Sequence, residues 1–277
     1  MKKQMQEKPP KAYKNADFLN SHDARIIRIM AEFLEPHARF RHERITDTIV
    51  FFGSARIQER KHALAHLKDV EALLAKTRKP TKKLLLEYRS AQTAVEMSKY
   101  YHDCVELSRL LTAWSKTLNH SHRFVVCSGG GPGIMEAANK GAALAKGKSI
   151  GLNISLPFEQ YANGYITPSL NFEFHYFFMR KFWFAYLAKA LVVFPGGFGT
   201  MDELFEILTL LQTDKIKKKM TVVIYGSDYW KRVINFDEIV RTGMASPEDL
   251  SLFRYCDDPR EAFEYLKESL LKNYPTA

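Results

Sequence analysis

Three short apolar segments of this sequence each end in a turn of small residues, and such turns are where many α/β proteins bind a ligand. The turns span residues 53–55, 128–133 and 195–200. Their glycines leave backbone N–H groups uncovered, and the N-terminus of a following helix adds partial positive charge. The chemistry that such turns favour is the binding of an anion, above all a phosphate group.

The third turn carries the most chemical information. Residues 195–203 read Pro-Gly-Gly-Phe-Gly-Thr-Met-Asp-Glu. We expect Thr200 to cap the next helix and to donate its hydroxyl to a phosphate, which places Asp202 and Glu203 in the first helical turn. Those two acids either complement the helix dipole or stand beside a bound anion. Glu206 either completes an acidic cluster with them or is solvated.

A second charged group lies in the aromatic segment 177–184, where Arg180 and Lys181 interrupt an apolar helix pattern. A charge in such surroundings needs a partner. One interpretation is a side chain that reaches the surface, or a buried ion pair. The other is an arginine fork on a phosphate or ribose, with Met179 or an aromatic neighbour packing against a base.

The glycine pattern favours a mononucleotide over a dinucleotide or a triphosphate. The turn at 128–133 offers the first two glycines of a G-x-G-x-x-G motif, but Ile134 stands where the third should be. The strand predicted at 149–154 is followed by no acidic residue of the kind that binds a ribose in dinucleotide folds. The G-K-[ST] ending of a phosphate loop for triphosphates is also missing.

The predicted elements alternate between strand and helix. We expect strands at 48–52, 124–127, 149–154, 190–194 and 220–225, and helices at 17–35, 134–145, 177–189, 201–212, 229–244 and 259–271. Residues 58–116 are predicted to be helical with a break at Pro80, residues 157–174 to form a surface loop, and Pro36 to end the first helix.

This alternation predicts an α/β fold with a doubly wound, Rossmann-like parallel sheet and an N-terminal helical elaboration, because parallel strands need crossovers that are usually helical. We expect one domain over residues 1–277, with a helical insertion at about 58–94 and a mobile tail at 1–14. The loops at the carboxyl ends of the strands should then bring all three glycine turns to one cleft.

Composition restricts the class of protein further. The 277 residues are 46% hydrophobic and carry a net charge of +10 that is dispersed along the chain, so we do not expect nucleic acid as the partner. No segment is long and apolar enough to predict a membrane span. The three cysteines have neither disulfide nor zinc-ligand spacing, and we expect a cytoplasmic protein without metal or cofactor.

The motifs together resemble those of the LOG family of phosphoribohydrolases, which are often labelled lysine decarboxylases. Residues 195–203 match the family signature P-G-G-x-G-T-x-x-E, and residues 128–135 resemble its second glycine loop. Residues 52–56 are similar to the first glycine loop, and residues 179–181 to the arginine-bearing helix. The resemblance extends over about 48–225 and leaves out residues 1–47 and 58–94.

The resemblance implies an N-glycosidase that converts nucleoside 5′-monophosphates, with AMP-like purines favoured, into free base and ribose 5-phosphate. It implies that Arg180 and Glu203 are the catalytic pair and that the subunits form a homodimer. The residues that it implies for substrate binding are Gly53, Ser54, Ser128, Gly129, Gly130, Gly131, Met179, Gly196, Gly197, Gly199 and Thr200.

The same residues are compatible with other classes of function. A non-catalytic nucleotide sensor or carrier would use the same phosphate-binding turns. A protein that binds single-stranded nucleic acid would fit the positive charge and the 13% aromatic content, although the aromatics cluster in core-like segments. Pyridoxal-dependent lysine decarboxylation is disfavoured, because neither Lys181 nor Lys189 stands where a Schiff base is expected. The base preference is left undetermined.

Overall fold

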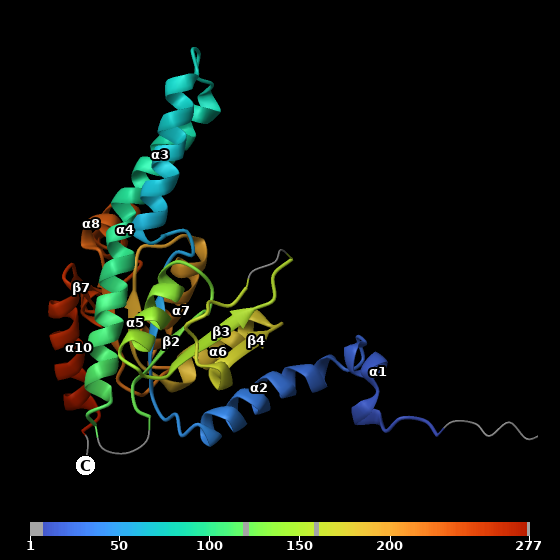
Figure 1. Cartoon of the computed structure of the whole chain (residues 1–277). Helices are drawn as coiled ribbons and strands as arrows, with labels where there is room; N and C mark the ends of the chain where they lie inside the picture. Colours follow the sequence, from blue (N-terminus) through green and yellow to red (C-terminus); the bar gives the residue numbers. More distant parts are fainter. Residues whose placement is uncertain (1–7, 119–121, 158–160, 276–277) are drawn as a thin grey trace, which may run out of the picture.

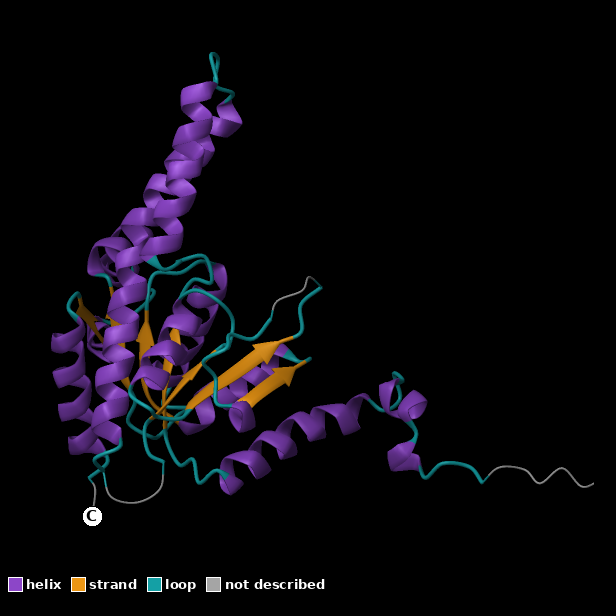
Figure 2. Ribbon diagram, viewed as in Figure 1, coloured by secondary structure: helices purple, strands orange, loops and turns teal. Residues whose placement is uncertain are grey.

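A parallel β-sheet forms the centre of the molecule. The computed structural model describes residues 8–118, 122–157 and 161–275. Within these residues the sheet has seven strands in the order β4-β3-β2-β1-β5-β6-β7, and every pairing is parallel (Figures 1 and 2). The strands are β1 (Thr48–Phe52), β2 (Val125–Ser128), β3 (Ser149–Ile154), β4 (Asn171–Phe174), β5 (Ala188–Val193), β6 (Thr221–Tyr225) and β7 (Phe253–Cys256).

Helices cover both faces of the sheet, which confirms the doubly wound α/β fold (Figure 2). One face packs against α4 (Lys82–Ser115), α5 (Ile134–Leu144) and α10 (Pro259–Asn273). The other face packs against α2 (Arg25–His42), α6 (Phe177–Leu187), α7 (Phe198–Gln212) and α8 (Ser227–Val233), while α9 (Phe236–Arg241) packs beside α7. All residues of β1, β2 and β6 are buried, as expected of central strands covered on both sides.

Two edge strands were not predicted from the sequence. β4 lies within the segment 157–174 that was expected to be a loop, and residues 158–160 of that segment lie outside the described residues. β7 follows the segment 229–244, which was predicted as one helix and forms two, α8 and α9. Each of the two strands has four residues and is only partly buried, because it is paired on one side alone. Their apolar runs are therefore too short to predict a buried strand.

The prediction that Pro36 ends the first helix is wrong. The chain forms α1 (Ala16–Asn20) and then α2, and Pro36 lies inside α2. Proline lacks the N–H that would bond the carbonyl of Glu32, four residues earlier. That carbonyl instead accepts a hydrogen bond from the indole Nε1–H of Trp183 at 2.9 Å, so the helix continues without an unpaired acceptor.

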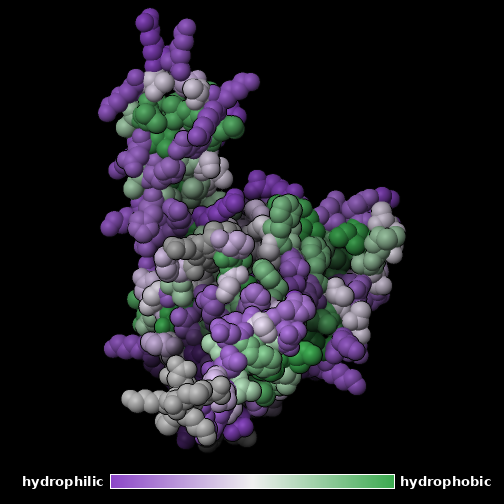
Figure 3. All heavy atoms as spheres, turned by 90° about the vertical axis from the view of Figure 1, so that its right-hand side faces the viewer, coloured by the Kyte–Doolittle hydropathy of each residue, from purple (hydrophilic) through white to green (hydrophobic). Residues whose placement is uncertain are grey.

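A two-helix arm projects from the body of the molecule (Figure 1). It is built from α3 (Arg60–Lys76) and the first half of α4, with the break at Pro80 where the sequence predicted it. Val70, Leu84 and Ala91 form a small apolar core between its helices. Figure 3 shows hydrophilic side chains projecting from the tip, where the sequence between 76 and 83 has five basic residues and no acidic one. The helical insertion thus forms a separate projection of the fold.

Candidate functional site

The glycine turns meet at the topological switch point of the sheet. β1 is followed by α3 and α4, and α4 packs on the face with α5, whereas the neighbouring strand β5 leads into α7 on the opposite face. The helices that follow the turns after β1 and β5 therefore lie on opposite faces, and a crevice forms where the chain segments diverge, which is where open α/β sheets bind ligands. Ser54 N donates to Pro195 O at 3.0 Å and Ile134 N donates to Ser54 O at 3.1 Å, so the three turns are in direct contact.

A cavity of about 700 Å³ lies at this crevice. The first and third glycine turns form one side of it, and α4 forms the other. Residues that the sequence had not assigned to the site line it, among them Arg56, Ser90, Thr93, Met97 and Tyr229. Sequence patterns within α4 could not identify Ser90, Thr93 and Met97, because their place beside the turns depends on how a long helix packs across the sheet.

The glycines of the third turn leave space for a ligand. A Cβ on Gly197 or Gly199 would meet nothing within 4 Å, and both residues are exposed. Gly196 is different, because a Cβ there would lie 2.1 Å from the Oγ1 of Thr200. Its carbonyl accepts a hydrogen bond from the Tyr229 hydroxyl at 2.7 Å. The turn is thus held by the protein at Gly196 and is open to a ligand at Gly197 and Gly199.

Helix α7 begins earlier than predicted, which corrects the positions of Thr200 and of the acidic residues. Its N-cap is Gly197 rather than Thr200, because Phe198 and Gly199 already have helical backbone. Thr200 is 6% exposed and packs beneath Gly196. Asp202 and Glu203 therefore lie in the second helical turn, and none of the residues of the first turn is acidic. Helix-dipole complementarity, which fades beyond the first turn, explains these acids poorly.

Arg180 of α6 and Glu203 of α7 form an ion pair, with 3.4 Å between the guanidinium Nη2 and the carboxylate Oε1. The side chains are 12% and 15% exposed. Burial raises the pKa of Glu203 to about 7, and Arg180 counteracts that rise only in part. The long contact explains the partial effect, since a well-formed charge-assisted hydrogen bond measures about 2.7–2.9 Å.

Arg180 keeps hydrogen-bonding capacity in reserve. Its Nε is buried, and no acceptor for it lies among residues 8–118, 122–157 and 161–275. A Cβ built on Gly129 would lie 3.9 Å from its Nη1, so the guanidinium reaches the second glycine turn. Burial lowers the pKa of Arg180 from its usual value, yet an arginine stays charged. The structure therefore brings Arg180, Glu203 and Gly129 together.

The second glycine turn is held from within the protein. Ser128 is fully buried, and its hydroxyl donates to Asn139 Oδ1 and accepts from Gly130 N. Asn163 donates to the carbonyls of Gly130 and Gly131 at 2.9 and 3.1 Å. Gly130 has a φ of +75°, and a Cβ there would also clash with a neighbouring side chain. The Ser128 side chain shapes the turn, whereas the predicted contact with a ligand would come from the backbone of Gly129.

Three other residues that the sequence analysis singled out, Lys181, Met179 and Gly53, contact other parts of the protein. Lys181 pairs with Asp202 at 2.8 Å and with Glu206 at 3.0 Å, so both acids outside the Arg180–Glu203 pair share a cation. Met179 is 7% exposed and belongs to the core beneath α6, which leaves little of it for a base. Gly53 lies beneath the second turn, since a Cβ on it would be 2.6 Å from the side chain of Ile134.

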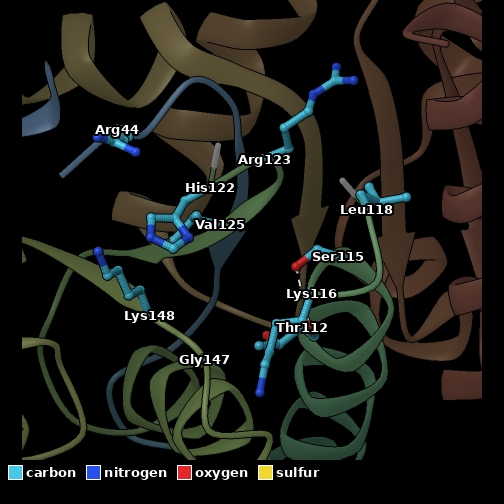
Figure 4. Close-up of a pocket in the computed structure, with 10 residues that line it drawn as sticks. All are labelled: Arg44, Thr112, Ser115, Lys116, Leu118, His122, Arg123, Val125, Gly147 and Lys148. Atoms are coloured by element: carbon cyan, nitrogen blue, oxygen red, sulfur yellow. Dashed lines mark hydrogen bonds between the residues drawn. The ribbon is translucent and has the colours of Figure 1, made fainter. Parts of the chain in front are cut away.

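Another cavity, of about 430 Å³, lies near the amino ends of β2 and β3 (Figure 4). Figure 4 shows His122 between Arg44 and Lys148, with residues of the C-terminal end of α4 opposite. Most of its cations are already paired: Lys148 with Glu43, Arg123 with Asp47, and Lys116 with the carbonyls of Ala145 and Lys146. This cavity lies at the amino ends of the strands, whereas the glycine turns lie at their carboxyl ends.

The described part of the chain has neither a candidate metal site nor a candidate membrane-spanning helix. It contains no group of three or more acidic, histidine or cysteine side chains that could hold a metal ion. It also contains no helix that is both long and apolar enough to cross a bilayer.

Comparison with known families gives one match. Residues 135–266 match the model of the family described as "Possible lysine decarboxylase". The matched segment contains both Arg180 and the motif at 195–203, so the resemblance to the LOG family, whose members often carry the lysine decarboxylase label, is confirmed there. No curated protein matches the chain well enough to count as a relative.

Several solved structures are similar to this chain. The molybdenum cofactor binding protein from the phototrophic bacterium Rippkaea orientalis is 17% identical, with 61% of this chain and 86% of that chain covered and a TM-score of 0.43. The structural-genomics target TM1055 is 18% identical, covering 80% and 99%, with a TM-score of 0.45. The Moco carrier protein from Chlamydomonas reinhardtii is 18% identical, covering 82% and 99%, with a TM-score of 0.44.

Proposed function

We propose that this protein hydrolyses the N-glycosidic bond of nucleoside 5′-monophosphates, with AMP-like purine nucleotides favoured, to a free base and ribose 5-phosphate. The observation that carries the proposal is the loose ion pair between Arg180 and Glu203 beside Gly129, with a carboxyl pKa near 7. A shielded acid with a perturbed pKa next to a phosphate-binding turn is typical of a catalytic group.

The substrate phosphate would bind at the start of α7. The N–H groups of the first helical turn have no partners within the helix, and Gly197 and Gly199 leave them uncovered. This contact is remote from the bond that breaks, so its binding energy can position the sugar. The phosphate then becomes a requirement of catalysis, and unphosphorylated nucleosides should be poor substrates.

Glu203 would act on the anomeric carbon. As the C1′–N bond breaks, its electron pair leaves with the base, which takes up a proton, and positive charge develops on the ribose ring. A carboxylate stabilises that charge and can accept a proton from the water that attacks C1′. A pKa of about 7 suits this role, because a substantial fraction of the group is then ionised at neutral pH and is still basic enough to take the proton.

Arg180 would position both the acid and the sugar. Its Nη2 holds the Glu203 carboxylate, while its Nη1 is directed toward the turn at Gly129. A guanidinium can bind two oxygens in a fixed geometry, so ribose or phosphate oxygens would satisfy the donors that it keeps in reserve.

The lysines near the site have other partners, which speaks against a Schiff-base mechanism. Lys181 is engaged by Asp202 and Glu206, and Lys189 pairs with Asp47 at the amino edge of the sheet. Burial lowers the pKa of Lys218 to about 8, but its Nζ donates to the carbonyls of Ala185 and Tyr186 at the end of α6. That environment stabilises a helix terminus.

The decisive experiment incubates the full chain with a panel of nucleoside 5′-monophosphates and the corresponding nucleosides, and measures free base by chromatography. Release of base from 5′-AMP, and far less from adenosine, supports the proposal. Tight binding of the monophosphates without any release favours a carrier or sensor. The features of this site that fit a carrier are the 15% exposure of the Glu203 side chain and its ion pair with Arg180, because both limit its access to a substrate.

We also infer that the protein is a cytoplasmic homodimer. The exposed side of α6 supports a second copy, because Phe177, Phe178 and Tyr186 are each more than half exposed there. The three cysteines are buried and free, as suits a reducing compartment. Light scattering coupled to size exclusion would give about twice the 32.0 kDa chain mass for a dimer, whereas a mass of one chain would contradict the inference.

A further inference from the structure

The switch-point cavity extends away from the proposed catalytic pair. Arg180 and Glu203 belong to α6 and α7, which pack on one face of the sheet. The cavity of about 700 Å³ lies between the third glycine turn and α4, which packs on the other face. Gly197 borders this cavity and is also the N-cap of α7, so a phosphate bound at α7 would have the sugar on one side and the cavity on the other.

The chemistry of the cavity wall suits further negative charge. Arg56 is exposed, and among the described residues its guanidinium has no ion-pair partner. Ser90 and Thr93 of α4 add two exposed hydroxyl groups on the opposite wall. None of the described residues that line the cavity is acidic. A cation that can form a fork, flanked by hydroxyl donors, fits the oxygens of a phosphate group.

The backbone around Arg56 keeps it at the cavity. Its own N–H donates to the Ser54 hydroxyl at 3.1 Å, and Ser54 N in turn donates to Pro195 O. The cation therefore stems from the turn that contacts the third glycine turn. Ile57, which follows it, is 5% exposed and anchors the segment in the core beneath α4.

We propose that this cavity binds a second phosphate group attached to the 5′-phosphate, so that the ligand class extends to nucleoside 5′-diphosphates and their esters. The proposal rests on the proposed function, because it takes the first phosphate to lie at α7. The base of the arm thus takes part in ligand binding, which gives the helical insertion a role at the site. The apolar side chains of Met97 and Phe198 would border the outer substituent of a diphosphate ester.

The test compares the affinities of ADP and AMP by isothermal titration calorimetry on the full chain. We expect ADP to bind more tightly than AMP, and Arg56→Ala to lower the ratio of ADP to AMP affinity by about tenfold or more, as for loss of a charge-assisted hydrogen bond. Ser90→Trp, which fills the cavity from an exposed helix position, should lower the same ratio. The matched control is Arg89→Ala, an exposed arginine of the same helix that does not line the cavity and should leave the ratio unchanged.

Two results would overturn the inference while leaving the proposed function intact. One is an ADP affinity no greater than that of AMP in a protein that releases base from AMP. The other is an equal loss of both affinities in Arg56→Ala, which would assign Arg56 to the first phosphate. If the ratio responds as expected but no base is released from AMP, the diphosphate site stands and the hydrolase proposal fails.

Discussion

Two largely buried ion pairs, one at the amino ends and the other at the carboxyl ends of the strands, differ in how well their atoms are satisfied. At the amino edge, the Asp47 carboxylate accepts from Arg123 Nε at 2.8 Å and lies 3.5 Å from Lys189 Nζ. At the carboxyl edge, Arg180 and Glu203 are 3.4 Å apart, and Arg180 Nε is buried without an acceptor among the described residues. The first pair has the geometry of a structural contact, whereas the second has unused capacity that a ligand can fill.

Burial alone does not separate the two pairs. The side chains of Arg123 and Asp47 are 17% and 9% exposed, close to the 12% and 15% of Arg180 and Glu203. What differs is the set of contacts that the acid makes, two cations for Asp47 and one distant guanidinium for Glu203. The pKa of Glu203 rises to about 7 because its long contact with Arg180 does not offset desolvation. Under-satisfied charge at a ligand-binding edge is therefore a better sign of function than burial is.

The largest effect is expected from Glu203→Gln. The amide keeps the shape of the side chain but cannot carry the negative charge that stabilises the ribose cation. We expect the turnover of 5′-AMP to fall about 10³-fold while nucleotide binding is retained. Single-turnover release of adenine and calorimetric binding would measure the two quantities. If the variant turns over 5′-AMP within a few fold of the unmodified protein, the Arg180–Glu203 pair has no more functional role than the Asp47 pair.

Asp47→Asn should change stability and spare the chemistry. The substitution leaves the largely buried cations Arg123 and Lys189 without their counter-ion, which costs about 3 kcal/mol of unfolding free energy. Denaturant unfolding monitored by circular dichroism would check this loss, and activity per folded molecule should be unchanged. A large loss of activity in a folded, stable variant would show that the amino edge also contributes to function.

Changes in pH should move the activity and the stability in opposite directions. Base release needs the Glu203 carboxylate, so kcat should fall about tenfold for each pH unit below about 7. The folded pKa is raised above the ordinary value of 4.5, so the folded state holds more protons than the unfolded state between pH 4.5 and 7. The contribution of this group to stability therefore decreases as pH rises through that window.

Glu203→Gln is the control for both pH effects, because an amide does not titrate. The variant should lose this part of the pH dependence of unfolding. A kcat profile of the unmodified protein that stays flat from pH 8 to pH 5 would argue against a carboxylate that titrates near neutrality.

The smallest effect is expected from Tyr229→Phe. The variant loses the hydrogen bond from the phenol hydroxyl to the Gly196 carbonyl, worth about 1 kcal/mol, and keeps the ring. The third glycine turn would be held less firmly, so KM for 5′-AMP should rise about fivefold with little change in kcat. Initial-rate kinetics would check this split. A fall in kcat with an unchanged KM would mean that Tyr229 acts on the transition state.

The sequence predicted the central strands and the glycine turns, because both depend on local patterns. β1 and β3 were predicted with their observed bounds, since their apolar runs mark buried strands. The start of α7 was missed by three residues, because glycines at 197 and 199 obscure the helical pattern that begins at Phe198. Local patterns predict an element better than they predict its first residue.

Contacts between distant segments were beyond prediction from sequence patterns. The place of Ser90 and Thr93 at the cavity depends on the packing of a 34-residue helix across the sheet. The continuation of α2 through Pro36 depends on Trp183, which follows almost 150 residues later in the chain. The approach of Arg180 to Glu203 was expected from the family resemblance, since the spacing of the two residues carries no such signal.

The most direct test of the central claim is a crystal structure of the Glu203→Gln variant with 5′-AMP bound. We predict the phosphate on the backbone amides around Gly197 and Gly199, and the side chain of residue 203 about 3–3.5 Å from C1′ or from a water beside it. A nucleotide whose C1′ lies far from residue 203, or whose phosphate binds away from the start of α7, would contradict the account.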